Sequence, residues 1–231
     1  MDAEPTVKGD PSLLAIGRPR KAFDYIRSYG LAGFAEQVHH RIATWHGERK
    51  FGVSTSGFIE PEELGIQNPD AQAYAALGYE HLRRALPEIP FPDSQVVFLD
   101  YGAGKGRALV CAAARPFRKV IGVEISAELV AIARQNLAQM KHRRAARAEV
   151  HYSDAAAFPV PDDVNVFFLF NSFIGWTLVE VVERMRQSHV LHPRDLFVIA
   201  FNQAEFDQCV RGETWLRKVE ENAYRALYRS V

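Results

Sequence analysis

The sequence predicts an α/β fold: a doubly wound, mostly parallel seven-stranded sheet that ends in a C-terminal antiparallel hairpin and follows an N-terminal helical extension. Five short apolar runs alternate with other segments, and unbroken apolar runs of this kind are typical of strands buried on both faces. A glycine turn follows the first run, as at the ligand-binding corner of doubly wound sheets. Alternating apolar and polar residues on both sides of Glu220–Asn222 predict the hairpin. The five parallel strands are expected at 96–100, 119–124, 149–154, 164–171 and 196–201.

The glycine turn narrows the choice of ligand. The first run ends at Asp100 and leads into Gly102, Gly104 and Gly106, before an alanine-rich segment that favours a helix. A dinucleotide fingerprint requires glycine where Arg107 stands, and the spacing of a phosphate-binding P-loop is also absent. Neither of these two nucleotide-binding patterns is therefore complete. A nicotinamide-dependent oxidoreductase is a weaker alternative, and a purely structural turn is a further one.

Polar residues end the next three strands as well. Glu124 closes the second strand, eighteen residues after Gly106, where a carboxylate accepts hydrogen bonds from the two ribose hydroxyls of an adenosine ligand. Asp154 ends the third strand and Asn171 the fourth. Since the carboxyl ends of parallel strands meet at one edge of a sheet, we expect Asp100 and these three residues to share one crevice.

The motifs D-Y-G-A-G-K-G-R, V-I-G-V-E-I-S and Y-S-D resemble those of class I methyltransferases that use S-adenosylmethionine (SAM), in particular a bacterial branch whose substrates are unassigned. The resemblance covers residues 71–231 and implies SAM as the cofactor. It also implies that Glu124, next to Ile125, holds the ribose, and that Asp154 and Ala155 hold the adenine. The turn would line the rest of the cofactor with Asp100, Gly102, Ala103, Gly104 and Gly106.

The end of the fourth strand bears on the methyl acceptor. Amino-group methyltransferases often carry N-P-P-[YF] there, whereas this chain reads Asn171-Ser172-Phe173. We therefore predict Asn171 and Phe173 as catalytic residues that hold a nitrogen nucleophile of a small molecule or a protein amine, with Asn171 also contacting the cofactor. A strand cap beside a core phenylalanine is an equal alternative.

Residues 1–70 are predicted to form an N-terminal arm and a helical extension or lid, and residues 71–231 the SAM-binding domain. Helices are expected over 71–86, from 127 to about 144 and over 176–186. The first of these leads directly into the glycine turn, so Tyr79 is a candidate for holding the cofactor. The alternative for Tyr79 is packing against the sheet.

Composition limits the other functions. The chain has 28 basic and 28 acidic residues, so general nucleic-acid or membrane binding is not favoured, and the basic cluster at 142–147 is explained by the end of a helix. The two cysteines, Cys111 and Cys209, form no disulfide framework and no metal-binding spacing. Without an apparent signal peptide or membrane span, we expect a cytoplasmic protein. A catalytically silent SAM-binding module that holds a partner through residues 20–70 is an alternative function, and the sequence leaves the acceptor and the oligomeric state open.

Overall fold

A computed structural model describes residues 19–201 and 204–231 and confirms the predicted sheet. Seven strands run in the order β5-β4-β3-β6-β7-β9-β8. The first five are parallel to one another, β9 is antiparallel to β7, and β8 is antiparallel to β9. Their bounds are β3 Val97–Tyr101, β4 Lys119–Glu124, β5 Ala148–Tyr152, β6 Val166–Phe170, β7 Phe197–Phe201, β8 Leu216–Glu221 and β9 Arg225–Ser230.

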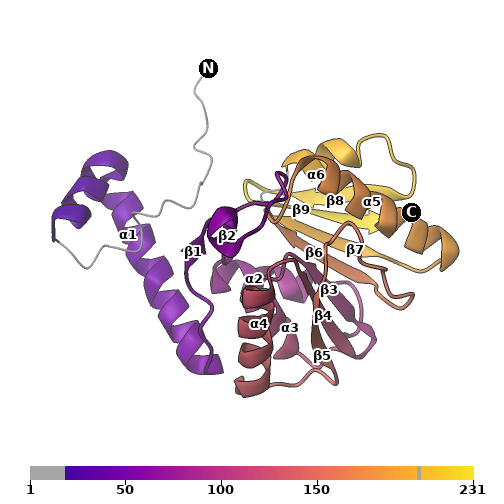
Figure 1. Cartoon of the computed structure of the whole chain (residues 1–231), viewed down its shortest axis with the longest axis horizontal. Coiled ribbons are helices and arrows are strands. Elements are labelled where there is room, and N and C mark those ends of the chain that lie inside the picture. Colours follow the sequence, from indigo (N-terminus) through magenta and orange to yellow (C-terminus); the bar gives the residue numbers. More distant parts are fainter. Residues whose placement is uncertain (1–18, 202–203) are drawn as a thin grey trace.

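The chain order of the strands creates a crevice beside β3. From β3 the chain builds outward through β4 to β5, and then crosses back to add β6 and β7 on the other side of β3 (Figure 1). The connections after β3 and β6 therefore leave the sheet in opposite directions. In open α/β sheets a ligand binds at such a switch point, outside the carboxyl ends of the strands.

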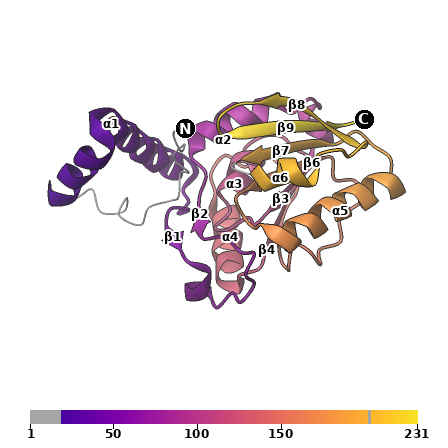
Figure 2. The ribbon, with the colours of Figure 1, turned by 90° about the horizontal axis from the view of Figure 1, so that it is seen from above.

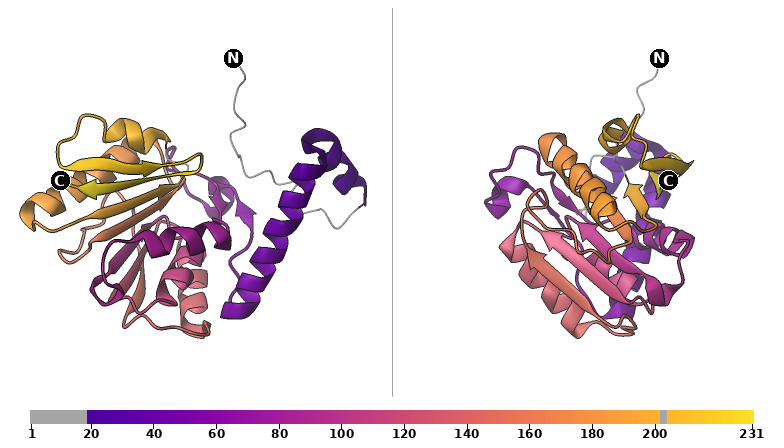
Figure 3. Two further views of the ribbon diagram at one scale, coloured as in Figure 1. Left: turned by 180° about the vertical axis from the view of Figure 1, so that it is seen from behind. Right: turned by 90° about the vertical axis from the view of Figure 1, so that its right-hand side faces the viewer.

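Helices cover both faces of the sheet and seal two apolar cores. One core contains side chains of α2 Tyr79–Ala85, α3 Arg107–Ala113 and α4 Ala127–Gln139. The other contains side chains of α5 Gly175–Leu191 and α6 Ala204–Cys209. The right-hand view of Figure 3 shows α5, in orange, crossing its face of the sheet. Every residue of β3 is buried, as the unbroken apolar run predicts.

Three predicted helix bounds were wrong, and α6 was not predicted. The helix expected at 71–86 is confined to α2, with the 3₁₀ turn Leu86–Glu88 after it, because residues 71–78 pair with other parts of the chain. The short strand β2 Tyr74–Ala75 lies antiparallel to β1 Phe58–Ile59, and Ala71 bridges to Phe173. The α4 helix ends at Gln139 rather than near 144, and α5 continues to Leu191. Further 3₁₀ turns form at Pro61–Leu64 and at Asp93–Gln95.

The first helix, α1 Pro19–Phe51, extends away from the sheet (Figures 1 and 2). It consists of two helices joined at Gly30, whose φ of 73° and ψ of 175° are not helical. The last turns of α1 contact the body: Gly47 lies against the Tyr79 ring, and the carbonyl of Phe51 accepts a hydrogen bond of 2.7 Å from Lys141 N. None of the helices in residues 19–201 and 204–231 is both long and apolar enough to cross a membrane.

Candidate functional site

A cavity opens at the carboxyl ends of β3, β4 and β6, where the sequence predicts the ligand. It contains about 930 Å³ of space, open solvent included. The predicted site residues in its lining are Asp100, Gly102, Ala103, Gly104, Glu124, Ile125, Asp154, Ala155, Asn171 and Phe173. Gly106 and Tyr79 are outside this lining. The opposite wall is formed by segment 64–77, which crosses the predicted boundary at residue 70.

The three glycines of the turn all have positive φ values, of 75°, 54° and 84°, which glycine adopts without strain. Two of them also allow other parts of the chain to approach closely. A Cβ on Gly102 would lie 2.3 Å from the side chain of Ser172, and one on Gly104 would lie 2.3 Å from the ring of Tyr74. At these two positions glycine is therefore required by neighbouring protein segments, in addition to any ligand.

Glu124 joins the end of β4 to the glycine turn. Its Oε2 accepts a hydrogen bond of 2.8 Å from Gly104 N, and its Oε1 accepts one of 2.9 Å from Ser126 N. Burial raises the pKa of Glu124, against the lowering effect of these hydrogen bonds. Each carboxylate oxygen has a second lone pair, so the group retains acceptor capacity toward the cavity.

Asp100 is a buried acid whose carboxyl group has no hydrogen-bond donor among the described residues. The residue is 4 % exposed. Burial, with a contribution from the charge of Glu124, raises the pKa of Asp100 to about 8. A buried carboxylate without a donor is costly, and a cationic ligand would supply the missing partner.

Asp154 and Ala155 border the cavity at the end of β5. The Asp154 Oδ1 accepts a hydrogen bond of 2.9 Å from Ala156 N, which fixes the turn, and Ala155 is buried. The turn therefore presents a half-buried carboxylate and a small side chain to the same cavity as Glu124.

The segment after β6 has an irregular backbone. Asn171 is exposed and has a φ of 43°, a left-handed conformation that asparagine tolerates better than most residues. Phe173 is buried, with its ring edge-on to that of Tyr101 at 6.4 Å. Ser172 Oγ donates to the carbonyl of Tyr101, which ties this segment to β3. Asn171 and Phe173 thus line the cavity from a loop held by its neighbours.

The structure does not bring Gly106 and Tyr79 to the cavity. Gly106 precedes α3 and approaches Ala133 of α4. The Tyr79 ring lies 4.8 Å from the Arg107 guanidinium, and its hydroxyl is 3.4 Å from Thr55 Oγ1. The aromatic side chain at the turn is Tyr74, which the sequence analysis had placed in a helix; its β-strand environment depends on pairing with β1.

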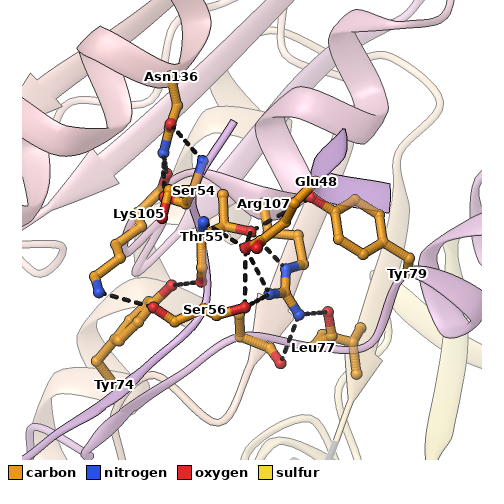
Figure 4. A network of polar contacts seen from close by, with 11 residues as sticks. Glu48, Ser54, Thr55, Ser56, Tyr74, Leu77, Tyr79, Lys105, Arg107 and Asn136 are labelled. Atoms are coloured by element: carbon orange, nitrogen blue, oxygen red, sulfur yellow. Dashed lines mark hydrogen bonds and ion pairs between the residues drawn. The ribbon is translucent and has the colours of Figure 1, made fainter. Parts of the chain in front are cut away.

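Arg107 has a place in the fold that no sequence pattern predicted. In the sequence it only excludes a dinucleotide fingerprint, yet in the structure it is 5 % exposed and connects α3 to the chain before the sheet (Figure 4). Its guanidinium donates to Thr55 Oγ1 at 2.8 Å, to Ser56 Oγ at 3.2 Å and to the Leu77 carbonyl at 3.3 Å. Glu48, 3.5 Å away, is its ion-pair partner. The signal in the sequence is the position of Arg107 directly after the glycine turn, since an arginine that is buried there needs an acidic partner.

Comparison with known proteins agrees with this geometry. Residues 98–194 match a sequence family described as a methyltransferase domain. Over these residues, less than half of the chain, the protein is similar to methyltransferase domains. The matched residues run from β3 to the end of α5 and so include both the glycine turn and Asn171. The chain matches no curated protein sequence.

Solved structures share the fold of the methyltransferase domain. An RNA methyltransferase from Salinibacter ruber, in complex with S-adenosyl-L-homocysteine (SAH), has a TM-score of 0.50 and 20% identity, over 68% of this chain and 92% of that one. A predicted N6-adenine-specific DNA methylase from Listeria monocytogenes has a TM-score of 0.51 and 14% identity, over 68% of this chain and 51% of that one. The carboxyl group of Asp100, which receives no hydrogen bond from the described residues, suits a positively charged ligand.

Proposed function

We propose that this protein binds SAM in the cavity at the ends of β3, β4 and β6 and transfers its methyl group to a nitrogen nucleophile of a small molecule or a protein amine. One observation carries the proposal: three carboxylates, Asp100, Glu124 and Asp154, line a cavity that closes over the glycine turn. SAM is a cation that also carries an adenine and a ribose with two vicinal hydroxyls, so it matches these acceptors in both charge and hydrogen bonding.

The chain's own residues would act mainly by positioning. SAM supplies an activated methyl group on a sulfonium centre, so the protein needs to align the acceptor and exclude water. Alignment of this kind contributes up to about 7–11 kcal/mol to a reaction barrier. In our proposal Glu124 holds the ribose, Asp154 and Ala155 hold the adenine, and the turn at 102–104 lines the remaining part.

The lining of the cavity supports an amine acceptor. Arg107 is the one cationic residue among the described residues of this lining, and its donors are directed to residues 55, 56, 76 and 77. A phosphate-bearing acceptor group would therefore find no free cation in the lining. The side-chain oxygen of Asn171 is an acceptor for the hydrogens of an amine, and Phe173 offers an apolar surface beside it.

The first experiment measures SAH binding by calorimetry. We expect the wild-type chain to bind, and Glu124→Ala to lose about 1–3 kcal/mol of binding free energy, because buried hydrogen bonds to a charged group are lost. Glu183→Ala is the matched control, since Glu183 pairs with Arg186 on the α5 helix. Unchanged affinity in Glu124→Ala would contradict the ribose assignment. Binding of NADH without binding of SAH would favour the oxidoreductase alternative instead.

The second experiment identifies the acceptor. Cell extract is incubated with the protein and SAM labelled in its methyl group, and the label is followed into protein, nucleic acid and small metabolites. Label in protein or in an amine metabolite supports the proposal, and loss of that label in Asn171→Ala supports the role of Asn171. Label in nucleic acid would contradict the acceptor class. Tight SAH binding with no transfer to any fraction would favour a catalytically silent module.

A further inference from the structure

We propose that Arg107 is a positioning residue for the cofactor: it fixes segment 54–77 against the glycine turn, and through this segment it sets the position of Gly104 and Glu124. The inference rests on the proposed function only in naming SAM as the ligand of the cavity.

The first step is the burial of the Arg107 charge. Guanidinium groups remain protonated, and a buried cation is stable only when its donors are used and a counter-charge is near. Here Thr55, Ser56 and two backbone carbonyls take the donors, at 2.8–3.5 Å. The acceptors come from both ends of segment 54–77. One planar side chain therefore holds the two ends of this segment together beside α3 (Figure 4).

The second step is the role of Glu48. Its Oε1 accepts hydrogen bonds from Thr55 N at 2.7 Å, Thr55 Oγ1 at 3.1 Å and Ser56 Oγ at 2.9 Å. Burial raises the pKa of Glu48, but these hydrogen bonds and the charge of Arg107 outweigh it, so the net shift is downward. The carboxylate thus stays ionised and clamps residues 55 and 56 from the side of α1.

The third step connects this clamp to the cavity. The hydroxyl of Tyr74 donates to the carbonyl of Thr55. The Tyr74 ring is so close to Gly104 that a Cβ there would overlap it, and Gly104 N in turn donates to Glu124 Oε2. The path Arg107–Thr55–Tyr74–Gly104–Glu124 is therefore a continuous set of contacts from Arg107 to the carboxylate assigned to the ribose.

Two further contacts secure the same segment from other elements. Asn136 of α4, 2 % exposed, donates to the carbonyls of Ser54 and Lys105, both at 2.9 Å. Lys105 Nζ donates to the carbonyl of Ser56 at 2.9 Å. Residues 54–56 are thus bound by the glycine turn and by α3 and α4, an arrangement that suits a fixed wall of the cavity better than a freely opening lid.

The test compares variants of two residues in this path with a variant of Arg115, an arginine outside the path. In Arg107→Lys the charge remains but one ammonium replaces the planar set of donors, and we expect the SAH dissociation constant to rise at least tenfold. Tyr74→Phe keeps the ring and removes one hydrogen bond, so we expect a rise of about threefold. Arg115→Ala removes a bidentate pair with Asp93 at the end of α3; it should change the SAH dissociation constant less than twofold.

A second readout is independent of the cofactor. Hydrogen exchange of the ligand-free protein should show faster exchange at residues 54–56 and 74–77 in Arg107→Lys than in wild type, and no change there in Arg115→Ala. Unchanged exchange in this segment, or wild-type SAH affinity in both Arg107→Lys and Tyr74→Phe, would overturn the inference. If wild type fails to bind SAH at all, the proposed function fails, while the exchange experiment still decides whether Arg107 holds the segment.

Discussion

At the scale of single residues, two neighbouring carboxylates of the site differ in their hydrogen bonds. Glu124 accepts two backbone hydrogen bonds at the end of β4, whereas Asp100, at the end of the neighbouring strand, receives none from the described residues. The same burial therefore has different consequences for the two acids. Glu124 is held in place by the turn, and Asp100 is available to a cation.

Asp100 leads to a prediction about pH. Its pKa of about 8 in the ligand-free protein is above the ordinary value of 3.8 for an aspartate. The protonated form thus stabilises the fold at low pH, and this contribution is lost as the pH rises toward 8. A cation prefers the ionised form, so SAM affinity should increase with pH, by at most about tenfold per unit, and level off above 8.

The measurement is a calorimetric titration with SAM between pH 6 and 9. In Asp100→Asn we expect weaker binding and a flatter pH dependence, because the titrating carboxyl group is gone. Since the neighbouring Glu124 is also buried with a raised pKa, Glu124→Gln serves as the second variant. A wild-type pH profile that Asp100→Asn leaves unaltered would exclude Asp100 as the titrating group.

At the scale of elements, the segment before the sheet builds part of the loop after β6. Asp70 Oδ2 accepts hydrogen bonds from Thr177 N at 2.8 Å and Thr177 Oγ1 at 2.9 Å, at the start of α5. The carbonyl of Asp70 accepts from Ile174 N at 3.0 Å, and Gln72 N donates to the carbonyl of Ser172. A residue distant in sequence thus caps α5 and supports the loop that contains Asn171 and Phe173.

From this arrangement we predict that Asp70→Ala lowers the free energy of unfolding by about 0.5–2 kcal/mol, the usual cost of losing a helix cap. Methyl transfer should fall as well, since the loop with Asn171 loses its support. Urea denaturation and transfer of labelled methyl groups measure the two effects. Ser188→Ala, near the other end of α5, is the control: Ser188 accepts from Arg194, and its loss should affect stability alone. Equal transfer rates in Asp70→Ala and wild type would contradict the prediction.

At the scale of the whole molecule, the cavity is formed by several separate parts of the chain between Leu64 and Thr177. The sheet contributes the strand ends, α5 contributes Thr177, and segment 64–77 contributes the opposite wall. The division of the chain into an extension, 1–70, and a domain, 71–231, stays a prediction. In the structure, segment 64–77 lines the cavity with residues from both sides of residue 70. A ligand in the cavity would therefore contact both parts of the chain.

A ligand held by both parts should stabilise the whole fold. At SAH concentrations about 100 times its dissociation constant, binding to the native state adds about 2.7 kcal/mol. For a chain of this size that corresponds to an increase in Tm of about 5–10 °C. Differential scanning fluorimetry with SAH, and with NADH as the control ligand, measures this shift. A shift with NADH and none with SAH would contradict SAM as the cofactor.

The sequence by itself determined the sheet, the glycine turn and the strand ends that carry Asp100, Glu124, Asp154 and Asn171. These features follow from local sequence patterns. An unbroken apolar run is typical of a strand buried on both faces, and the last residue of a parallel strand lies at the edge of the sheet where ligands bind. Only the tertiary structure decided the roles of Arg107, Tyr74 and Asp70. Arg107 and Thr55 are 52 residues apart in sequence, and Asp70 and Thr177 are 107 apart. Contacts over such separations leave no period in the sequence: they arise when the folded sheet brings the earlier segment back across its edge.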